Sequence, residues 1–157
     1  MDRGRRNVLK QGGGVTLLSL LAATGWLTSG EAAAQTWNKG AFDTHSLDET
    51  VKALGGSTPV PSNDITFFAT PDIAENGAVV PIGVASNVPR TESIAIMVDK
   101  NPNTLAAVFD IPAGTETTVS TRIKMAQTSS VFALVKAEGK YYVASKEIKV
   151  TLGGCGG

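Results

Sequence analysis

The 157-residue sequence has only one cysteine and one histidine, and this scarcity excludes several kinds of site. A disulfide framework needs at least two cysteines, so burial of apolar side chains must hold the fold together. A closed zinc site takes four ligands, usually Cys and His, which Cys155 and His45 cannot supply alone. Covalent haem attachment needs two cysteines followed by a histidine, and that motif does not occur.

An excess of charge of one sign is also missing, since 14 basic and 14 acidic residues give a formal net charge of zero. The sequence has no basic patch interleaved with aromatic residues, so binding to nucleic acid has no support. It contains neither a Gly-x-Ser-x-Gly nucleophile elbow nor a glycine-rich phosphate loop. These absences disfavour the common classes of enzyme.

The N-terminus has the three parts of an export signal in their usual order. The run RRNVLK at residues 5–10 has a twin-arginine pattern, a weakly apolar stretch covers residues 15–27, and three alanines end at Ala34. Such a segment is typical of a removable signal, and its apolar part is shorter than the about 20 residues that span a bilayer. We therefore expect a signal peptide at residues 1–34, cleavage after Ala34, and a periplasmic protein without membrane insertion.

Residues 35–152 have the pattern of one domain that begins with a short helix. We expect this helix near residues 43–54, because Ser46 and Glu49 have the spacing of a capping box. The pair Gly55-Gly56 supplies its C-terminal stop. Its apolar stripe consists of Leu47, Val51 and Leu54.

From residue 64 onward the apolar residues alternate with a period of two, which indicates strands. The strands that we expect cover residues 65–69, 78–85, 93–99, 105–111, 117–125, 131–136 and 141–152. Pro81 predicts a sheet edge or a bulge, an interruption at residues 144–147 predicts another bulge, and Glu138-Gly139 predicts a tight hairpin. About seven short strands without intervening helices predict an all-β fold, an immunoglobulin-like antiparallel β-sandwich.

The chain ends in a run in which two glycines stand on each side of the cysteine: Gly153, Gly154, Cys155, Gly156 and Gly157. Glycine gives the backbone wide conformational freedom and removes side-chain bulk, so we predict a flexible arm that presents a thiol. The extended reach from Leu152 to Cys155 is about 10 Å at about 3.4 Å per residue. This arrangement favours a covalent carrier, with Cys155 as the loading point and other proteins as the catalysts.

Other interpretations of the C-terminus stay open on the residues alone. Cys155 would be an incidental thiol on a terminal tail, or would form an intermolecular disulfide in a structural β-sandwich. A terminal Gly-Gly can also carry sulfur as a thiocarboxylate, in which case Gly157 is the loaded residue. A catalytic triad of Cys155, His45 and an acid is disfavoured, because a flexible tail works against pre-organised catalysis.

Four segments of the chain resemble the SoxY family, the sulfur-carrier subunits of the periplasmic thiosulfate-oxidising Sox multienzyme system. They are AENG at residues 74–77 running into VPI at 80–82, VDKNPN at 98–103, TRIKMA at 121–126, and GGCGG at 153–157. The resemblance covers essentially the whole chain, including the twin-arginine signal, and the C-terminal run matches the swinging arm of the family.

This resemblance implies a non-catalytic immunoglobulin-like subunit that pairs with a second sandwich subunit, SoxZ, as a heterodimer. It implies that Cys155 is joined covalently to thiosulfate-derived sulfur by a c-type haem conjugating enzyme. A metal-dependent hydrolase then releases sulfate, and a sulfur dehydrogenase, where present, oxidises the remaining sulfur. In this scheme the chain binds no cofactor or metal of its own.

Overall fold

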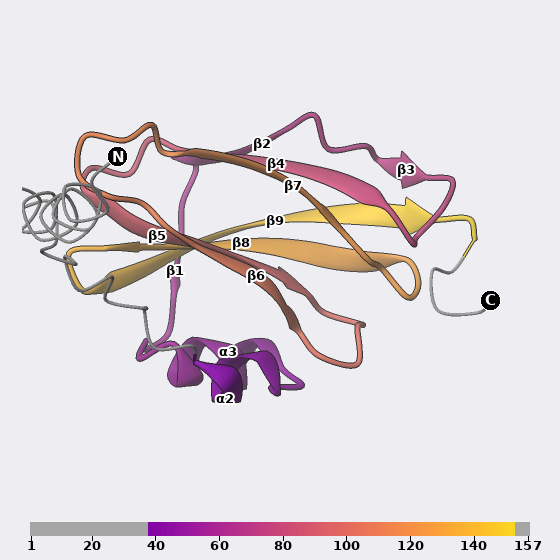
Figure 1. Ribbon diagram of the computed structural model, residues 1–157, viewed down its shortest axis with the longest axis horizontal. Coiled ribbons are helices and arrows are strands. Elements are labelled where there is room, and N and C mark those ends of the chain that lie inside the picture. The colour runs from indigo at the N-terminus through magenta and orange to yellow at the C-terminus, as the bar shows by residue number, and fades with distance from the viewer. Residues whose placement is uncertain (1–37, 153–157) are drawn as a thin grey trace, which may run out of the picture. The chain divides into compact units, whose positions relative to one another are not determined.

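The computed structural model describes residues 38–152, which form a β-sandwich with two short helices (Figure 1). The predicted signal peptide at residues 1–34 lies outside the described residues. So do residues 35–37 and the predicted arm at residues 153–157, which includes Cys155.

The described chain begins with two helices and continues as nine strands. The helices are α2 (Lys39–Phe42) and α3 (Leu47–Ala53). The strands are β1 (Val60–Pro61), β2 (Ile65–Phe68), β3 (Ile73–Ala74), β4 (Val80–Ser86), β5 (Thr91–Val98), β6 (Leu105–Asp110), β7 (Thr118–Ile123), β8 (Ser129–Ala137) and β9 (Lys140–Val150). Each of the seven predicted strands is present, with ends that differ by a few residues.

The strands form two sheets that face each other. The larger has the order β1-β9-β8-β5-β6, with β3 also paired to β9, and the smaller has the order β2-β4-β7. Alternate residues of facing strands point into the space between the sheets, so Ile94, Ile96 and Val98 of β5 meet the apolar face of β4. The predicted all-β sandwich of immunoglobulin type is confirmed.

The two helices cover the outer face of the larger sheet, opposite the smaller sheet (Figure 1). The residues of β5 that alternate with the inner set, Ala95 and Met97, form a second cluster with Ala41 and Val51 of the helices. Strand β5 is therefore buried on both faces. The phenol of Tyr141 donates a hydrogen bond to the carbonyl of Leu54 at 2.6 Å, which ties the end of α3 to β9.

The prediction of one helix at residues 43–54 was wrong in number and length. A separate turn, α2, precedes α3, because the Asn38 side chain accepts a hydrogen bond from the Ala41 backbone and caps it. Helix α3 begins after Ser46, whose hydroxyl accepts from the Glu49 backbone at 3.3 Å, as predicted. The helix ends at Ala53, and Gly55, two residues later, has a φ of +81° and takes part in the backbone bonds of a Schellman motif that close the helix.

Two features of the sheet edges differ from the sequence-based expectations. Strands β1 and β3, of two residues each, were not predicted, and both pair in parallel with β9. The bulge expected at residues 144–147 is absent, since β8 and β9 keep one register from Ser129↔Ile148 to Ala137↔Lys140. Pro81 lies where β4 has β7 on one side and β2 does not reach, so its missing N–H removes no ladder bond.

The β8–β9 hairpin turns through Glu138 and Gly139, as predicted. Both residues have positive φ, 50° and 72°, which is the geometry of a type I′ turn. This turn closes the longest pair of strands, and β9 then runs the length of the sandwich to Val150. The hairpin therefore fixes which end of the sandwich the C-terminus leaves.

Candidate functional site: the root of the C-terminal arm

The last described residues, Val150 to Leu152, connect β9 to the predicted arm, and we call them the arm root. A neighbouring segment, residues 74–77, runs beside them and is called the bracket. The Gly77 N–H donates to the Leu152 carbonyl at 2.8 Å, and the Thr151 N–H donates to the Ala74 carbonyl at 3.1 Å. The Thr151 hydroxyl adds a bond to the Glu75 carbonyl at 3.1 Å. The backbone is therefore held as far as the carbonyl of Leu152.

A threonine holds the opposite side of the arm root. Backbone pairing between β8 and β9 ends at Ser129↔Ile148, two residues short of the position that faces Val150. There the Thr128 hydroxyl accepts from the Val150 N–H at 2.9 Å and approaches the Val150 carbonyl at 3.5 Å. The side chain thus continues the ladder where the β8 backbone no longer does.

The bracket is in turn fastened to the core. The Met125 N–H donates to the Gly77 carbonyl at 2.7 Å, and the Met125 side chain is fully buried. Asn101 clasps the residues on both sides of Met125, donating to the Lys124 carbonyl at 2.7 Å and accepting from the Ala126 N–H at 3.0 Å. A continuous chain of hydrogen bonds therefore runs from Asn101 to the arm root.

The three internal segments of the sequence resemblance meet in this chain of bonds. Residues 74–77 form the bracket, 121–126 carry Met125, and 98–103 carry Asn101. Sequence reasoning identified these segments but not their joint role at the arm root. Their Asn-Gly and Asn-Pro-Asn turns are readable signals, whereas the contacts between distant segments are not.

The arm root is surrounded by apolar side chains that face solvent. The exposed fractions of Ile73, Val79 and Leu152 are 58%, 56% and 68%. Nearby, the Lys146 ammonium bonds the Thr70 carbonyl at 2.6 Å and the Asp72 carboxylate at 3.0 Å, which leaves this cation engaged away from the C-terminus. Exposed apolar groups beside the exit of the arm suit contact with another protein.

The described part of the chain offers no second chemical centre of the usual kinds. Between residues 38 and 152 no three His, Cys, Asp or Glu side chains are placed to hold a metal ion. No helix in that range is long and apolar enough to cross a membrane. The exposed His45 ring lies with Nδ1 2.6 Å from the Pro102 carbonyl, so Nδ1 carries the proton and donates it. His45 directly precedes Ser46, the N-cap of α3, and its ring makes a structural contact with the loop at Pro102.

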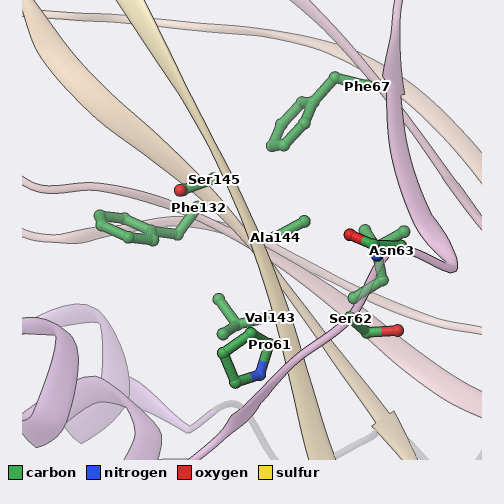
Figure 2. A pocket seen from close by; sticks show the side chains of 9 residues that line it. Pro61, Ser62, Asn63, Phe67, Phe132, Val143, Ala144 and Ser145 are labelled. Atoms are coloured by element: carbon green, nitrogen blue, oxygen red, sulfur yellow. The ribbon is translucent and has the colours of Figure 1, made fainter.

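A hollow of about 400 Å3 lies beside β9, between β1 and β2. Figure 2 shows the side chains that line it. Its wall is mostly apolar, and its polar side chains are Ser62, Asn63 and Ser145. None of its lining residues is titratable, so the hollow provides no acid–base pair. The lining consists of Pro61, Ser62, Asn63, Ile65, Phe67, Phe132, Val143, Ala144 and Ser145.

A second hollow, of about 490 Å3, lies near the β8–β9 turn and has charged residues in its wall. These charges are already paired: Glu92 bonds Lys136 at 2.9 Å, and Arg90 bonds Glu138. The hydrogen bond from Lys136 lowers the pKa of the Glu92 carboxyl, and Glu92 raises the pKa of Lys136 in return. Both groups stay charged near neutral pH, which suits an exposed ion pair better than proton transfer.

Comparison with known proteins gives one close group. The family described as sulfur oxidation protein SoxY matches residues 51–155. The solved structure of the sulfur carrier protein SoxY from Chlorobium limicola f thiosulfatophilum is 39% identical, with a TM-score of 0.62 over 68% of this chain and 97% of its own. A superoxide reductase (neelaredoxin) from Ignicoccus hospitalis is 17% identical over 55% of this chain and 78% of its own. Its TM-score of 0.47 is too low to support a conclusion about this chain. No curated protein matches the sequence.

Proposed function

This chain belongs to the SoxY family of sulfur oxidation proteins, and we propose that its sulfur-carrier role is performed by Cys155 as the covalent attachment point. The family match extends to residue 155, so this cysteine lies within the matched range. That observation carries the proposal. The arm root supports it, because a backbone held as far as Leu152 leaves three residues, or about 10 Å, for delivery of the thiol.

The proposed loading step joins thiosulfate to the Cys155 thiol through a new S–S bond. The thiol loses its proton, and the two electrons released by forming the bond pass to a c-type haem conjugating enzyme. A metal-dependent hydrolase then adds water to the terminal sulfone and releases sulfate, which leaves a persulfide on Cys155. A sulfur dehydrogenase, where present, oxidises that remaining sulfur.

Catalysis belongs to these partners because the arm has no means of activating its own thiol. A cysteine with an ordinary pKa near 8.5 is only a few per cent thiolate at neutral pH. The four residues next to Cys155 are glycines, so no neighbouring cation in the sequence stabilises the thiolate. We propose that deprotonation occurs inside each partner's cleft, which the narrow glycine arm can enter.

The proposal includes a heterodimer with SoxZ and transient docking to each enzyme. With about 10 Å of reach, a partner that takes Cys155 must bring its surface close to the arm root. The exposed Ile73, Val79 and Leu152 offer apolar contact area there. Ordering of the arm at each docking opposes association, so affinity for each enzyme is expected to be modest, as a shuttle requires.

Intact-protein mass spectrometry of the mature protein from cells grown on thiosulfate tests the proposal. We expect mass additions that correspond to sulfur or thiosulfate, disappear with reductant and localise to the Cys155 peptide. An adduct on Gly157 would replace the proposal by the thiocarboxylate carrier. An unmodified thiol, or only a dimer linked through Cys155, would contradict the carrier role of this cysteine.

We also propose that the protein acts in the periplasm after twin-arginine export and cleavage behind Ala34. The twin-arginine pathway transports folded proteins, and the sequence has no cofactor motif of its own to explain that route. A SoxZ partner without a signal would travel with this chain.

Substitution of both Arg5 and Arg6 by lysine is expected to keep the chain and its SoxZ partner in the cytoplasm. Immunoblots of periplasmic and cytoplasmic fractions measure this, and Arg3→Lys, outside the pair, is the matched control. If SoxZ still reached the periplasm with the double variant, joint export would be wrong.

A further inference from the structure

We propose that the bracket at residues 74–77 sets the reach of Cys155, and that Thr151 and Asn101 are positioning residues for its delivery. The inference rests on the proposed function, because reach matters only if Cys155 is presented to enzymes. It goes further by assigning the length of the free arm to hydrogen bonds within the sandwich.

Hydrogen bonds to the bracket hold the last described residues of the chain. Three hydrogen bonds join the bracket to the arm root: Gly77 N–H to Leu152 O, Thr151 N–H to Ala74 O, and Thr151 Oγ1 to Glu75 O. Gly77 is buried, whereas Thr151 and Leu152 are exposed and place little apolar area in the core. Thr151 and Leu152 are therefore held mainly by these bonds, each of which contributes modestly when exposed to water.

The bracket is itself held by the segment that carries Met125. The Gly77 peptide is bonded on both sides, through its N–H to Leu152 and through its carbonyl to Met125. Met125 lies between Lys124 and Ala126, the two residues whose backbone groups Asn101 binds. Loss of the Asn101 amide loosens the strand that holds Gly77, and the effect reaches Leu152 through contiguous bonds.

The reach of Cys155 depends on where the held backbone ends. With the bracket closed, the backbone is held as far as Leu152, and three further residues of the predicted arm lead to Cys155, about 10 Å when extended. If Thr151 and Leu152 leave the bracket, five residues are free and the reach grows to about 17 Å. The bracket thus selects the depth of cleft into which the thiol fits.

Reach affects rate because the thiol must meet the reacting atom in a defined geometry. A misplacement of about 1 Å can reduce a rate by about a hundredfold, so an arm too short for its cleft loads poorly. A longer free segment can recover contact, at the cost of a wider search. A short arm should therefore be rescued by opening the bracket, and a role of Asn101 in stability alone gives no such rescue.

The test uses the mature chain with its SoxZ partner, thiosulfate and the haem-containing conjugating enzyme. Deletion of Gly153 and Gly154 shortens the arm and is expected to lower the rate of enzyme-dependent loading at least tenfold. Addition of Thr151→Val or Asn101→Ala to the shortened chain is expected to restore that rate roughly fivefold, because each removes bonds that keep the bracket closed. Asn103→Ala, an exposed asparagine of the same loop, is the matched control and should restore nothing.

Two further measurements separate the possible failures. Hydrogen exchange of the Gly77 and Thr151 amides should be roughly fivefold faster in the Asn101→Ala chain, with a full-length arm. Labelling of Cys155 by a small aromatic disulfide should be the same in all chains, because that reagent needs no cleft. Unchanged hydrogen exchange, or faster exchange without recovery of loading, would contradict the proposed role of the bracket. A full-length chain that labels normally but takes no thiosulfate from the enzyme overturns the proposed function itself.

Discussion

Replacement of Cys155 by serine is expected to abolish covalent sulfur loading while the β-sandwich keeps its stability. A serine hydroxyl cannot form the S–S bond that holds the cargo, and its proton is far harder to remove than that of a thiol. The residue lies outside residues 38–152, whose side chains form the two core clusters of the sandwich. Intact mass, thermal unfolding and thiosulfate-dependent oxygen uptake of cells that carry the variant measure the three parts of this prediction.

Each competing interpretation of the C-terminus gives a different result with the same variant. A structural sandwich keeps thiosulfate-dependent respiration after Cys155→Ser, and a thiocarboxylate carrier keeps its adduct on Gly157. Gly156→Ala is the matched control, since it changes the arm by one methyl group and keeps the thiol. Respiration that persists without the Cys155 thiol would contradict the carrier mechanism.

Substitution of Gly83 by alanine is expected to destabilise the fold by about 2–3 kcal/mol and to lower Tm by roughly 10 °C. A Cβ at this position of β4 would lie 2.5 Å from the Phe68 carbonyl oxygen and 2.7 Å from the Phe68 ring. The ring can rotate away, but the carbonyl belongs to β2, which pairs with β4 at Phe68↔Gly83. The smaller sheet must therefore shift to admit one methyl group.

A second glycine gives the control for this measurement. At Gly40 in α2 a Cβ would have its nearest contact, Asn38 Oδ1, at 3.8 Å, and alanine favours a helix. We expect Gly40→Ala to change the free energy of unfolding by less than about 0.5 kcal/mol, or to raise it slightly. Equal effects of the two substitutions, measured by urea unfolding, would show that β2 does not lie against Gly83 in solution.

The strands were predictable because alternation determines which side chains face the core. In β7 the apolar residues of the alternating pattern, Val119 and Ile123, are buried, and Arg122 between them is exposed. Met97 and Met125 are fully buried in the core. A period of two survives folding because it depends only on the pleat of a strand.

The errors fall where tertiary contacts overrule local pattern. Strands β1 and β3 have two residues each, too few to show a period, and exist because β9 offers them a free edge. The polar run at residues 144–147 suggested a bulge, yet β8 holds β9 in a single register through it. Helix α2 depends on the Asn38 cap and on burial of Ala41 against the larger sheet, which the sequence alone does not reveal.

The candidate site also has one part that the sequence indicates and another part that only the fold shows. Cys155 stays a prediction that rests on its neighbours in the sequence, because glycines on both sides predict a narrow, flexible arm. The support of the arm root was missed, because Asn101 and Thr128 lie 22 to 25 residues from the residues that they bond. The partners of Gly77, which are Met125 and Leu152, are farther still along the sequence. A glycine tail is readable from the sequence, whereas the place at which the tail begins depends on the fold.

The position of β9 also determines how the carrier bears a mechanical load. In the proposed function, a partner that holds Cys155 while the two proteins separate puts tension on the sandwich along the axis of β9. Hydrogen bonds to β8 on one side and to β3 on the other lie across that axis, so they share the strain and must fail together. A strand pulled from its side would instead lose its bonds one at a time. Strand β9 therefore anchors the arm root through its pairing with neighbouring strands on both sides.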